Sequence, residues 1–320
     1  MARVLVTGAT GFIGRLLCEN LAGAGHVVRA ALRTDRAVPA CIAEKTVTGD
    51  ITGATRWGTA LEDVDLVIHT AARTHVLYDS PGNARLYMET NADGTQALAA
   101  QSARGGIRRF VFLSSIKVNG EGRGVRPYTA EDEPHPQDAY GTSKWLAEQR
   151  LWEIVARTAL PAAVVRAPLV YGAGVGANFL RLLRSIDDER LLPLAAVRNR
   201  RSLVSVWTLC DLLRRLLEHP AAVKGTWMVS DAEDISVPEL VRRIAHLMGR
   251  RARLLSVPPS LLRAAGALVG RGAEMRRLCA SLTVDMAATR ERLGWRPPLS
   301  MDAALARTVG WYRSEGRPSP

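Results

Sequence analysis

Short apolar runs alternate with amphipathic stretches through the first half of the chain. Buried β-strands are predicted at five of these runs, residues 4–6, 27–31, 64–70, 110–113 and 162–165. Helices are predicted where apolar positions recur every three or four residues, at 12–22, 88–104 and 140–158. Strands and helices that alternate in this way form a parallel sheet with helices on both faces. The pattern therefore predicts an α/β fold built on a doubly wound parallel sheet of the Rossmann type.

The second half of the chain is less regular and predicts a second, smaller unit. Strands are predicted at 203–206 and 226–229, and helices at 178–185, 237–248 and 302–312. We place the boundary near residue 170, with a Rossmann domain over 1–170 and a smaller, mainly C-terminal α/β domain over 171–320. Elements near 203–230 are expected to return to the first domain.

Three glycines stand directly after the first predicted strand. Gly8, Gly11 and Gly14 are spaced three residues apart, and Thr10, Phe12 and Ile13 lie among them. Gly8 permits a tight turn, Gly11 lets backbone N–H groups approach a phosphate, and Gly14 lets the following helix pack closely on the sheet. The N-terminus of that helix presents unpaired N–H groups at the same place. The motif predicts a site for the pyrophosphate of a dinucleotide.

A tyrosine and a lysine one helical turn apart supply a candidate acid–base pair. Tyr140 and Lys144 stand at the start of the third predicted helix. A phenol with a pKa of about 10 is a poor base at neutral pH, and a neighbouring ammonium lowers that pKa by stabilising the phenolate. Ser114 and Ser115 end the strand at 110–113, where side chains face the ligand crevice of such sheets. We expect Ser115, Tyr140 and Lys144 to act together on a hydroxyl or ketone.

The G-x-x-G-x-x-G spacing, followed in order by Ser115, Tyr140 and Lys144, resembles the extended short-chain dehydrogenase/reductase superfamily. Residues 114–120 are similar to the NAD-dependent epimerase/dehydratase family, and most of all to its UDP-glucose 4-epimerase branch and the related 4-ketoreductases. The resemblance covers nearly the whole chain. It implies an enzyme that uses NAD(P) to oxidise and reduce C4 of a nucleotide sugar, a UDP-sugar. The 4,6-dehydratases of the family carry an Asp-Glu pair where this chain has Ile116 and Lys117, which disfavours dehydratase activity.

The motifs leave several activities open. A UDP-sugar 4-epimerase of the UDP-glucose or UDP-N-acetylglucosamine type is favoured narrowly. An NAD(P)H-dependent reductase of a UDP-4-keto-6-deoxy-sugar would use the same three side chains. A dihydroflavonol- or steroid-type reductase and a non-catalytic, cofactor-binding regulator are lesser alternatives. The regulator predicts a broken catalytic set, and here the set is intact.

The resemblance also implies which residues line the cofactor. Asp50 and Ile51 stand where the family contacts the adenine. The other residues implied are Thr70, Ala71, Ala72, Asn91, Ser114, Tyr140, Lys144 and Pro168. Relatives specific for NAD carry an acidic residue at the end of the second strand, where this chain has Leu32 followed by Arg33. Arg33 could grip a 2′-phosphate and weakly favours NADP(H), whereas an epimerase would favour tightly bound NAD.

Substrate contacts are implied in both halves of the chain. The residues that match the family's substrate positions are Ser115, Lys117, Asn178, Arg201, Arg276 and Arg277. An arginine clamp suits the diphosphate of a UDP-sugar because a guanidinium binds phosphate oxygens in pairs.

The charge is unevenly distributed. The chain has 43 Lys+Arg and 31 Asp+Glu, and residues 161–320 hold 25 of the basic and 14 of the acidic side chains. A diphosphate substrate explains part of this excess. Because aromatic residues make up only 5 % of the chain and no basic stripe interleaves with them, no nucleic-acid partner is expected.

The remaining features bear on the compartment and the partners that we expect for the protein. Four cysteines lie far apart with no C-x-x-C pair, which predicts free thiols in the cytoplasm and no metal site. The best apolar run, residues 261–270, is about half as long as a transmembrane helix and contains Arg263, so no membrane partner is expected. The family usually dimerises through the helices that carry Asn91 and Tyr140. We therefore expect a homodimer, with candidate contacts at Leu98, Trp145, Leu146 and Trp152.

Overall fold

Seven parallel strands form the main sheet of the computed structural model, which describes residues 1–74, 81–122, 126–268 and 270–317. In spatial order the strands are β3 (Glu44–Val47), β2 (Val27–Leu32), β1 (Arg3–Thr7), β4 (Leu66–His69), β5 (Arg109–Ser115), β6 (Ala162–Ala167) and β9 (Lys224–Met228). Every neighbouring pair is parallel. The order reverses between β1 and β4, so the carboxyl ends of these two strands flank a crevice of the kind that binds ligands. The predicted Rossmann-type fold is confirmed.

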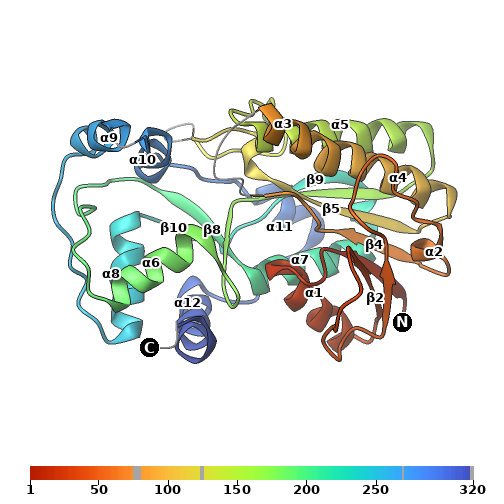
Figure 1. The fold of residues 1–320 in the computed structure, drawn as a ribbon, viewed down its shortest axis with the longest axis horizontal. Coiled ribbons are helices and arrows are strands. Elements are labelled where there is room, and N and C mark those ends of the chain that lie inside the picture. Colours follow the sequence, from red (N-terminus) through yellow and green to blue (C-terminus); the bar gives the residue numbers. More distant parts are fainter. Residues whose placement is uncertain (75–80, 123–125, 269, 318–320) are drawn as a thin grey trace.

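Helices cover both faces of this sheet (Figure 1). The helices α1 (Phe12–Gly23) and α7 (Val206–Glu218) pack on one face, and α2 (Gly58–Leu61), α4 (Gly94–Arg104) and α5 (Ala139–Arg157) pack on the other. Alternate residues of β1 enter the two cores: Val4 and Val6 face α1, and Leu5 faces α4. This two-sided burial explains why the central strands are apolar throughout.

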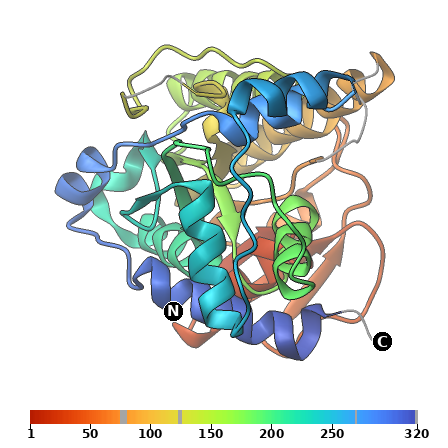
Figure 2. The same cartoon turned by 90° about the vertical axis from the view of Figure 1, so that its left-hand side faces the viewer.

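A second, smaller sheet carries the rest of the chain. Its strands lie in the order β10 (Asp234–Ile235), β8 (Arg201–Ser205) and β7 (Leu169–Tyr171). A third core joins it to α6 (Ala177–Asp187), α8 (Val237–Met248) and α12 (Met301–Trp311). The helices α9 (Pro259–Leu268) and α10 (Gly272–Cys279) pack side by side on this part of the molecule (Figures 1 and 2). The short α11 (Ala287–Leu293) packs against the main sheet through Leu293.

Residues 203–230 divide between the two sheets. The strand expected at 203–206 is β8, which belongs to the small sheet and ends at Ser205. Ser205 then caps α7, because its hydroxyl accepts a hydrogen bond from the Thr208 N–H. The main sheet receives α7 on its face and β9 beside β6.

One expected dimer contact is wrong. Leu98 is fully buried within the chain's own core between α4 and the sheet, so it is not available to a second copy. Trp152 packs partly against the same core, while Trp145 and Leu146 are half-buried on α5. Within the described residues, no helix has both the length and the apolar character needed to cross a membrane.

Candidate active site

The glycine loop joins β1 to α1 and requires glycine at two of its positions. Gly8 has φ +69°, and a Cβ there would lie 2.9 Å from the Ala71 nitrogen. A Cβ on Gly14 would lie 2.0 Å from the Gly8 oxygen. Gly11 caps α1 without a side-chain hydrogen bond, so no capping side chain occupies the N–H groups of the first turn. An uncapped helix end behind a side-chain-free loop fits the pyrophosphate of a dinucleotide.

The other residues of the loop also contact the protein core. Phe12 and Ile13 are half-buried against the core beneath α1. The Ile13 carbonyl accepts the Cys210 thiol at 3.8 Å, which ties α1 to α7. Thr10 is half-buried in the turn before them.

Two opposite charges meet beyond the end of β2. Leu32 ends the strand and is buried, and the next residue, Arg33, lies 3.5 Å from the Asp50 carboxylate. Both side chains are largely exposed. The Ile51 side chain packs on Gly94 of α4, where an added Cβ would lie 2.4 Å from Ile51 Cγ2. The loop that carries Asp50 and Ile51 is therefore held close to that helix. The structure thus brings together the two residues expected at the adenosine end of the cofactor.

The loop after β4 is tied to the end of β1. Thr70 donates its hydroxyl to the Thr7 carbonyl at 2.7 Å, and the Ala71 N–H donates to the Thr7 hydroxyl at 3.1 Å. Ala72 follows, half-buried. The two loops that would face a dinucleotide are therefore one hydrogen-bonded unit.

A buried histidine extends this unit to α4. Thr7 Oγ1 lies 2.7 Å from His69 Nδ1, and Thr95 Oγ1 lies 3.0 Å from Nε2. The Thr95 hydroxyl donates to the Asn91 carbonyl at 2.6 Å, so it accepts from His69, whose proton must sit on Nε2. Burial, with a smaller contribution from Lys144, lowers the pKa of His69 to about 3. The ring is thus a neutral link at physiological pH, and sequence reasoning missed this role.

Asn91 connects the loop after β4 to the helix that carries Tyr140. It lies in a π-helical turn, η1 (Met88–Asp93), and its side chain bonds both the N–H (2.8 Å) and the carbonyl (3.1 Å) of Arg73. Its Nδ2 also donates to Ser143 at 2.9 Å, and Ser143 donates to the Tyr140 carbonyl at 2.7 Å. The chain of contacts fixes where α5 begins relative to the cofactor loops.

Ser115 and Tyr140 meet at the carboxyl end of β5. Ser115 ends the strand, and its hydroxyl lies near enough to the Tyr140 phenol to lower the pKa of that group. Asp138 caps α5 by accepting from the Gly141 N–H at 2.7 Å, which starts the helix just before Tyr140. Burial raises the pKa of Tyr140 to about 12, although Ser115 opposes the shift.

The influence of Lys144 on Tyr140 differs from expectation. Lys144 is 1 % exposed, and its Nζ lies 4.0 Å from the centre of the Phe112 ring. Burial lowers the pKa of Lys144 to about 7, opposed by Glu148. The predicted lowering of the Tyr140 pKa by this lysine is therefore wrong for this structure, because the ammonium packs on β5 and is itself poorly solvated.

A second network, which the sequence did not reveal, lies beneath Ser115. Ser114 donates to Glu148 at 2.5 Å, and Arg166 of β6 binds the same carboxylate through Nε (3.1 Å) and through a second nitrogen (2.7 Å). Arg166 also donates to Asn119 at 3.1 Å. Glu148 and Arg166 are buried, so α5 is tied to β5 and β6 by a desolvated ion pair. Ser114 thus faces this pair.

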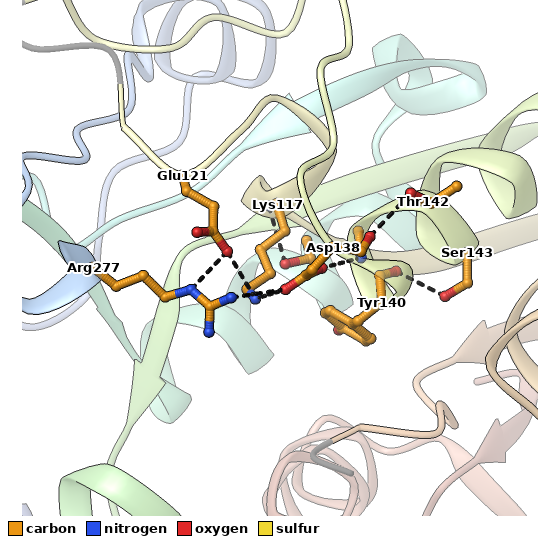
Figure 3. A network of polar contacts seen from close by, with 9 residues as sticks. Lys117, Glu121, Asp138, Tyr140, Thr142, Ser143 and Arg277 are labelled. Atoms are coloured by element: carbon orange, nitrogen blue, oxygen red, sulfur yellow. Dashed lines mark hydrogen bonds and ion pairs between the residues drawn. The ribbon is translucent and has the colours of Figure 1, made fainter. Parts of the chain in front are cut away.

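Four charged side chains form a network beside Tyr140 (Figure 3). Lys117 pairs with Asp138 and lies 3.4 Å from Glu121. Arg277 of α10 contacts Glu121 at 2.8 Å and Asp138 at 3.5 Å. The Lys117 Nζ is 6.0 Å from the centre of the Tyr140 ring. The network joins α10 to the start of α5 and brings two of the substrate candidates, Lys117 and Arg277, to one place.

The other substrate candidates are placed differently. Arg201 donates to the carbonyls of Arg277 (2.7 Å) and Ala280 (3.1 Å), so it supports the end of α10. Arg276 is exposed on α10, and Asn178 is exposed on α6, where it accepts a hydrogen bond from Arg181. Pro168 is buried between β6 and β7. Across the described ranges, no group of three or more His, Cys, Asp or Glu could hold a metal ion.

Comparison with known proteins places this geometry in a family. Residues 4–229 match the NAD dependent epimerase/dehydratase family. A UDP-glucose 4-epimerase of Vibrio cholerae is 37 % identical over 310 residues, which are 96 % of this chain and 94 % of that protein.

Solved structures share the fold. A UDP-glucose 4-epimerase of Thermotoga maritima with UDP-glucose aligns with a TM-score of 0.80 at 20 % identity, over 98 % of this chain and 100 % of that one. A UDP-glucuronic acid 4-epimerase of Bacillus cereus in complex with NAD aligns at 0.79 and 17 % identity, over the same shares of the two chains. The family match over most of the chain, supported by the Vibrio relative, shows that this chain belongs to the NAD-dependent epimerase/dehydratase family.

Proposed function

We propose that this chain is an enzyme, a UDP-sugar 4-epimerase that keeps NAD bound through its catalytic cycle. The observation that carries the proposal is the position of Ser115 next to the Tyr140 phenol at the carboxyl end of β5. It is supported by the 37 % identity to an enzyme named for UDP-glucose 4-epimerisation. The site has the hydroxyl groups that such a reaction needs, and Ile116 and Lys117 stand where the dehydratases of the family carry their Asp-Glu pair.

NAD would be held by three parts of the chain: the glycine loop at residues 8–14, the Arg33–Asp50 pair, and the loop at residues 70–72. When bound there, NAD would supply the hydride chemistry of oxidation and reduction at C4 of the sugar. Tyr140 receives the C4 hydroxyl proton in the first half of the cycle and returns it in the second. Ser115 hydrogen-bonds the same oxygen and keeps it beside the phenol.

Tyr140 needs a nearby positive charge to take up that proton. With its pKa raised to about 12, the phenol is neutral at pH 7, and a phenolate forms readily only beside a cation. Lys144 lies one turn further along α5, and Lys117 lies near the ring. We propose that Lys144 serves the cofactor, and that Lys117 is the cation near Tyr140 and faces the sugar.

For the cofactor, the Arg33–Asp50 pair favours NAD over NADP. The two side chains together carry no net charge, so they offer little attraction to a 2′-phosphate. The weak preference for NADP(H) that Arg33 alone indicates is thereby reduced.

For the substrate, Arg276 and Arg277 would supply charge to the diphosphate while Arg201 holds the end of α10. We also propose a homodimer through α5, where Trp145 and Leu146 are half-buried.

The test is an NMR assay of purified protein with UDP-glucose or UDP-N-acetylglucosamine and no added cofactor. Catalytic appearance of the C4 epimer is expected, and Tyr140→Phe should abolish it. Tyr312→Phe is the matched control, because Tyr312 lies in the turn after α12, away from Tyr140, and its hydroxyl donates to Asp187 at 3.4 Å.

The alternative outcome is a folded protein that makes no epimer and reduces a UDP-4-keto-6-deoxy-sugar with NADH or NADPH. That result would replace the proposed epimerase activity by a 4-ketoreductase activity. The two activities share the Ser115, Tyr140 and Lys144 set, so only the substrate and the cofactor requirement separate them.

A further inference from the structure

The helix α9 is apolar on all sides and yet lies on the surface. Of its ten residues, Pro259–Leu268, only Ser260 and Arg263 are polar. Leu262 faces inward and packs in a cluster with Leu194 and Val197. A surface helix normally turns polar residues to water, and a helix that is apolar all round is normally covered.

The uncovered side of α9 forms a continuous stripe. Leu261, Ala264, Ala265 and Leu268 recur at helical spacing and are all exposed, and we call them the α9 surface. Leu261 is 59 % exposed and Leu268 is 89 % exposed. Figure 1 places α9 at the end of the molecule remote from the N-terminal strands, and Figure 2 looks onto that end.

Two further exposed leucines lie in the segment that leads into α9 and in the segment after α6 that pairs with it. Leu191 and Leu255 are both exposed, and the backbone joins their neighbourhoods, since the Leu255 N–H donates to the Leu192 carbonyl at 2.8 Å. With Leu261 and Leu268 they are four of the nine exposed large apolar side chains in the described part of the chain.

Arginines are frequent in the part of the chain that contains α9. Residues 249–279 contain seven arginines and a single acidic residue, Glu274. Five of the seven form no ion pair with any described residue: Arg251, Arg253, Arg263, Arg271 and Arg276. Glu274 itself is paired with Arg181 at 3.2 Å. The surface therefore combines exposed apolar side chains with uncompensated positive charge.

We propose that the α9 surface docks on an anionic membrane, with Leu261 and Leu268 at the boundary of headgroups and acyl chains and Arg263 and Arg271 on lipid phosphates. A helix that lies in the interface needs an apolar face and basic flanks, but not the length of a spanning helix. The expectation of no membrane partner rested on the lack of a spanning segment, and interfacial docking requires none.

Other partners fit these residues less well. A nucleic acid would favour aromatic side chains for stacking, and residues 249–279 contain none. A second copy docked on the same surface would bring the arginines of both chains together, and the neighbouring carboxylates of Asp187 and Glu274 already pair with Arg250 and Arg181. An anionic lipid surface satisfies the leucines and the arginines at once.

Docking at α9 would also bring the candidate site near the membrane. The next helix, α10, carries Arg277, which contacts Glu121 and Asp138 beside Tyr140. The inference itself is independent of the proposed epimerase activity, because no residue of the α9 surface belongs to that site.

The test is co-sedimentation of the full chain with vesicles of phosphatidylcholine alone or mixed with phosphatidylglycerol. Binding to the mixed vesicles is expected, weakening as salt is raised. Leu261→Ser with Leu268→Ser should reduce the partition coefficient about tenfold or more. Arg263→Gln with Arg271→Gln should flatten its salt dependence. The matched control is Val47→Ser with Val223→Ser, which removes two comparably exposed apolar side chains elsewhere. It should change neither the partition coefficient nor its salt dependence.

Three results would overturn the proposal. The first is an absence of binding to mixed vesicles by folded parent protein. The second is equal loss of binding in the control pair. The third is a change of oligomeric state in Leu261→Ser with Leu268→Ser, measured by sedimentation velocity without lipid, which would assign the α9 surface to a second copy. Activity of the leucine variant on a soluble UDP-sugar should match the parent and reports that the fold is intact.

Discussion

Replacing Lys144 by methionine is expected to stabilise the folded protein at neutral pH while abolishing its activity. The lysine is almost completely buried against Phe112, and burial lowers its pKa from 10.5 to about 7. Methionine keeps a long apolar side chain at this position and removes the group that titrates.

The magnitude follows from the pKa difference between the unfolded and folded states. Between pH 7 and 10.5 the unfolded chain binds one more proton at Lys144, so this residue's contribution to stability rises with pH over that range. At 1.36 kcal/mol per pKa unit, the cost of the buried lysine at pH 7 is on the order of 4 kcal/mol. The cost should fall to roughly 2 kcal/mol at about pH 9 and vanish above the unfolded pKa.

The assay is guanidinium unfolding of nucleotide-stripped protein, followed by tryptophan fluorescence at neutral and at alkaline pH. Lys144→Met should exceed the parent in free energy of unfolding, and the gap should shrink as the pH rises. Lys45→Met is the matched control, because Lys45 is an exposed lysine that pairs with Asp35 at 2.6 Å, and its substitution should change stability by less than about 0.5 kcal/mol. A Lys144→Met protein less stable than the parent at neutral pH, or a gap independent of pH, would refute the argument.

Three further outcomes are expected. Glu148→Gln should lower the free energy of unfolding by about 3–5 kcal/mol, because Arg166 is left buried without its counter-charge; a denaturation midpoint equal to the parent's would contradict this. Gly14→Ala should abolish retention of NAD, because the new Cβ would lie 2.0 Å from the Gly8 carbonyl oxygen. The retained NAD is measured as the nucleotide released when the purified protein is denatured, and one NAD per chain would contradict the packing argument. Asp50→Asn should raise the affinity for NADPH relative to NADH by roughly two- to fivefold, because it removes the carboxylate that neutralises Arg33. Fluorescence titration measures the ratio of the two affinities, and an unchanged ratio would contradict the neutralising role of Asp50.

The parts of the fold that could be predicted from sequence are those with local signals. The central strands are apolar because both faces are buried, and residues 8–14 carry a glycine pattern that only a tight turn and a close helix require. The helix at 237–248 was predicted at the bounds of α8, because Ser236 caps it and Pro238 suits its first turn.

A signal for α7 was present and was missed. Leu209, Leu212, Leu213, Leu216 and Leu217 follow the spacing of a helix face, and all five are buried. The adjoining apolar run at 203–206 suggested only a strand, and the change from strand to helix at Ser205 was overlooked.

Other features depend on distant contacts and have no local signal. The Glu148–Arg166 pair joins α5 to β6, and each residue alone resembles an ordinary surface charge in the sequence. Lys144 is buried on Phe112 and does not lower the pKa of Tyr140, and only the packing of α5 on β5 reveals this. The hydrogen bonds that make His69 a neutral link likewise come from three separate elements.

The position of β9 at the edge of the main sheet sets the order in which this protein can be completed during synthesis. The strand beside it, β6, ends at Ala167, but β9 begins only at Lys224 and the covering helix α7 only at Val206. Until the ribosome has passed residue 228, the nascent chain has an open β6 edge and one incompletely covered sheet face. An N-terminal fragment that stops near residue 170 should therefore aggregate instead of folding, and a nonsense mutation between residues 170 and 224 should yield insoluble protein.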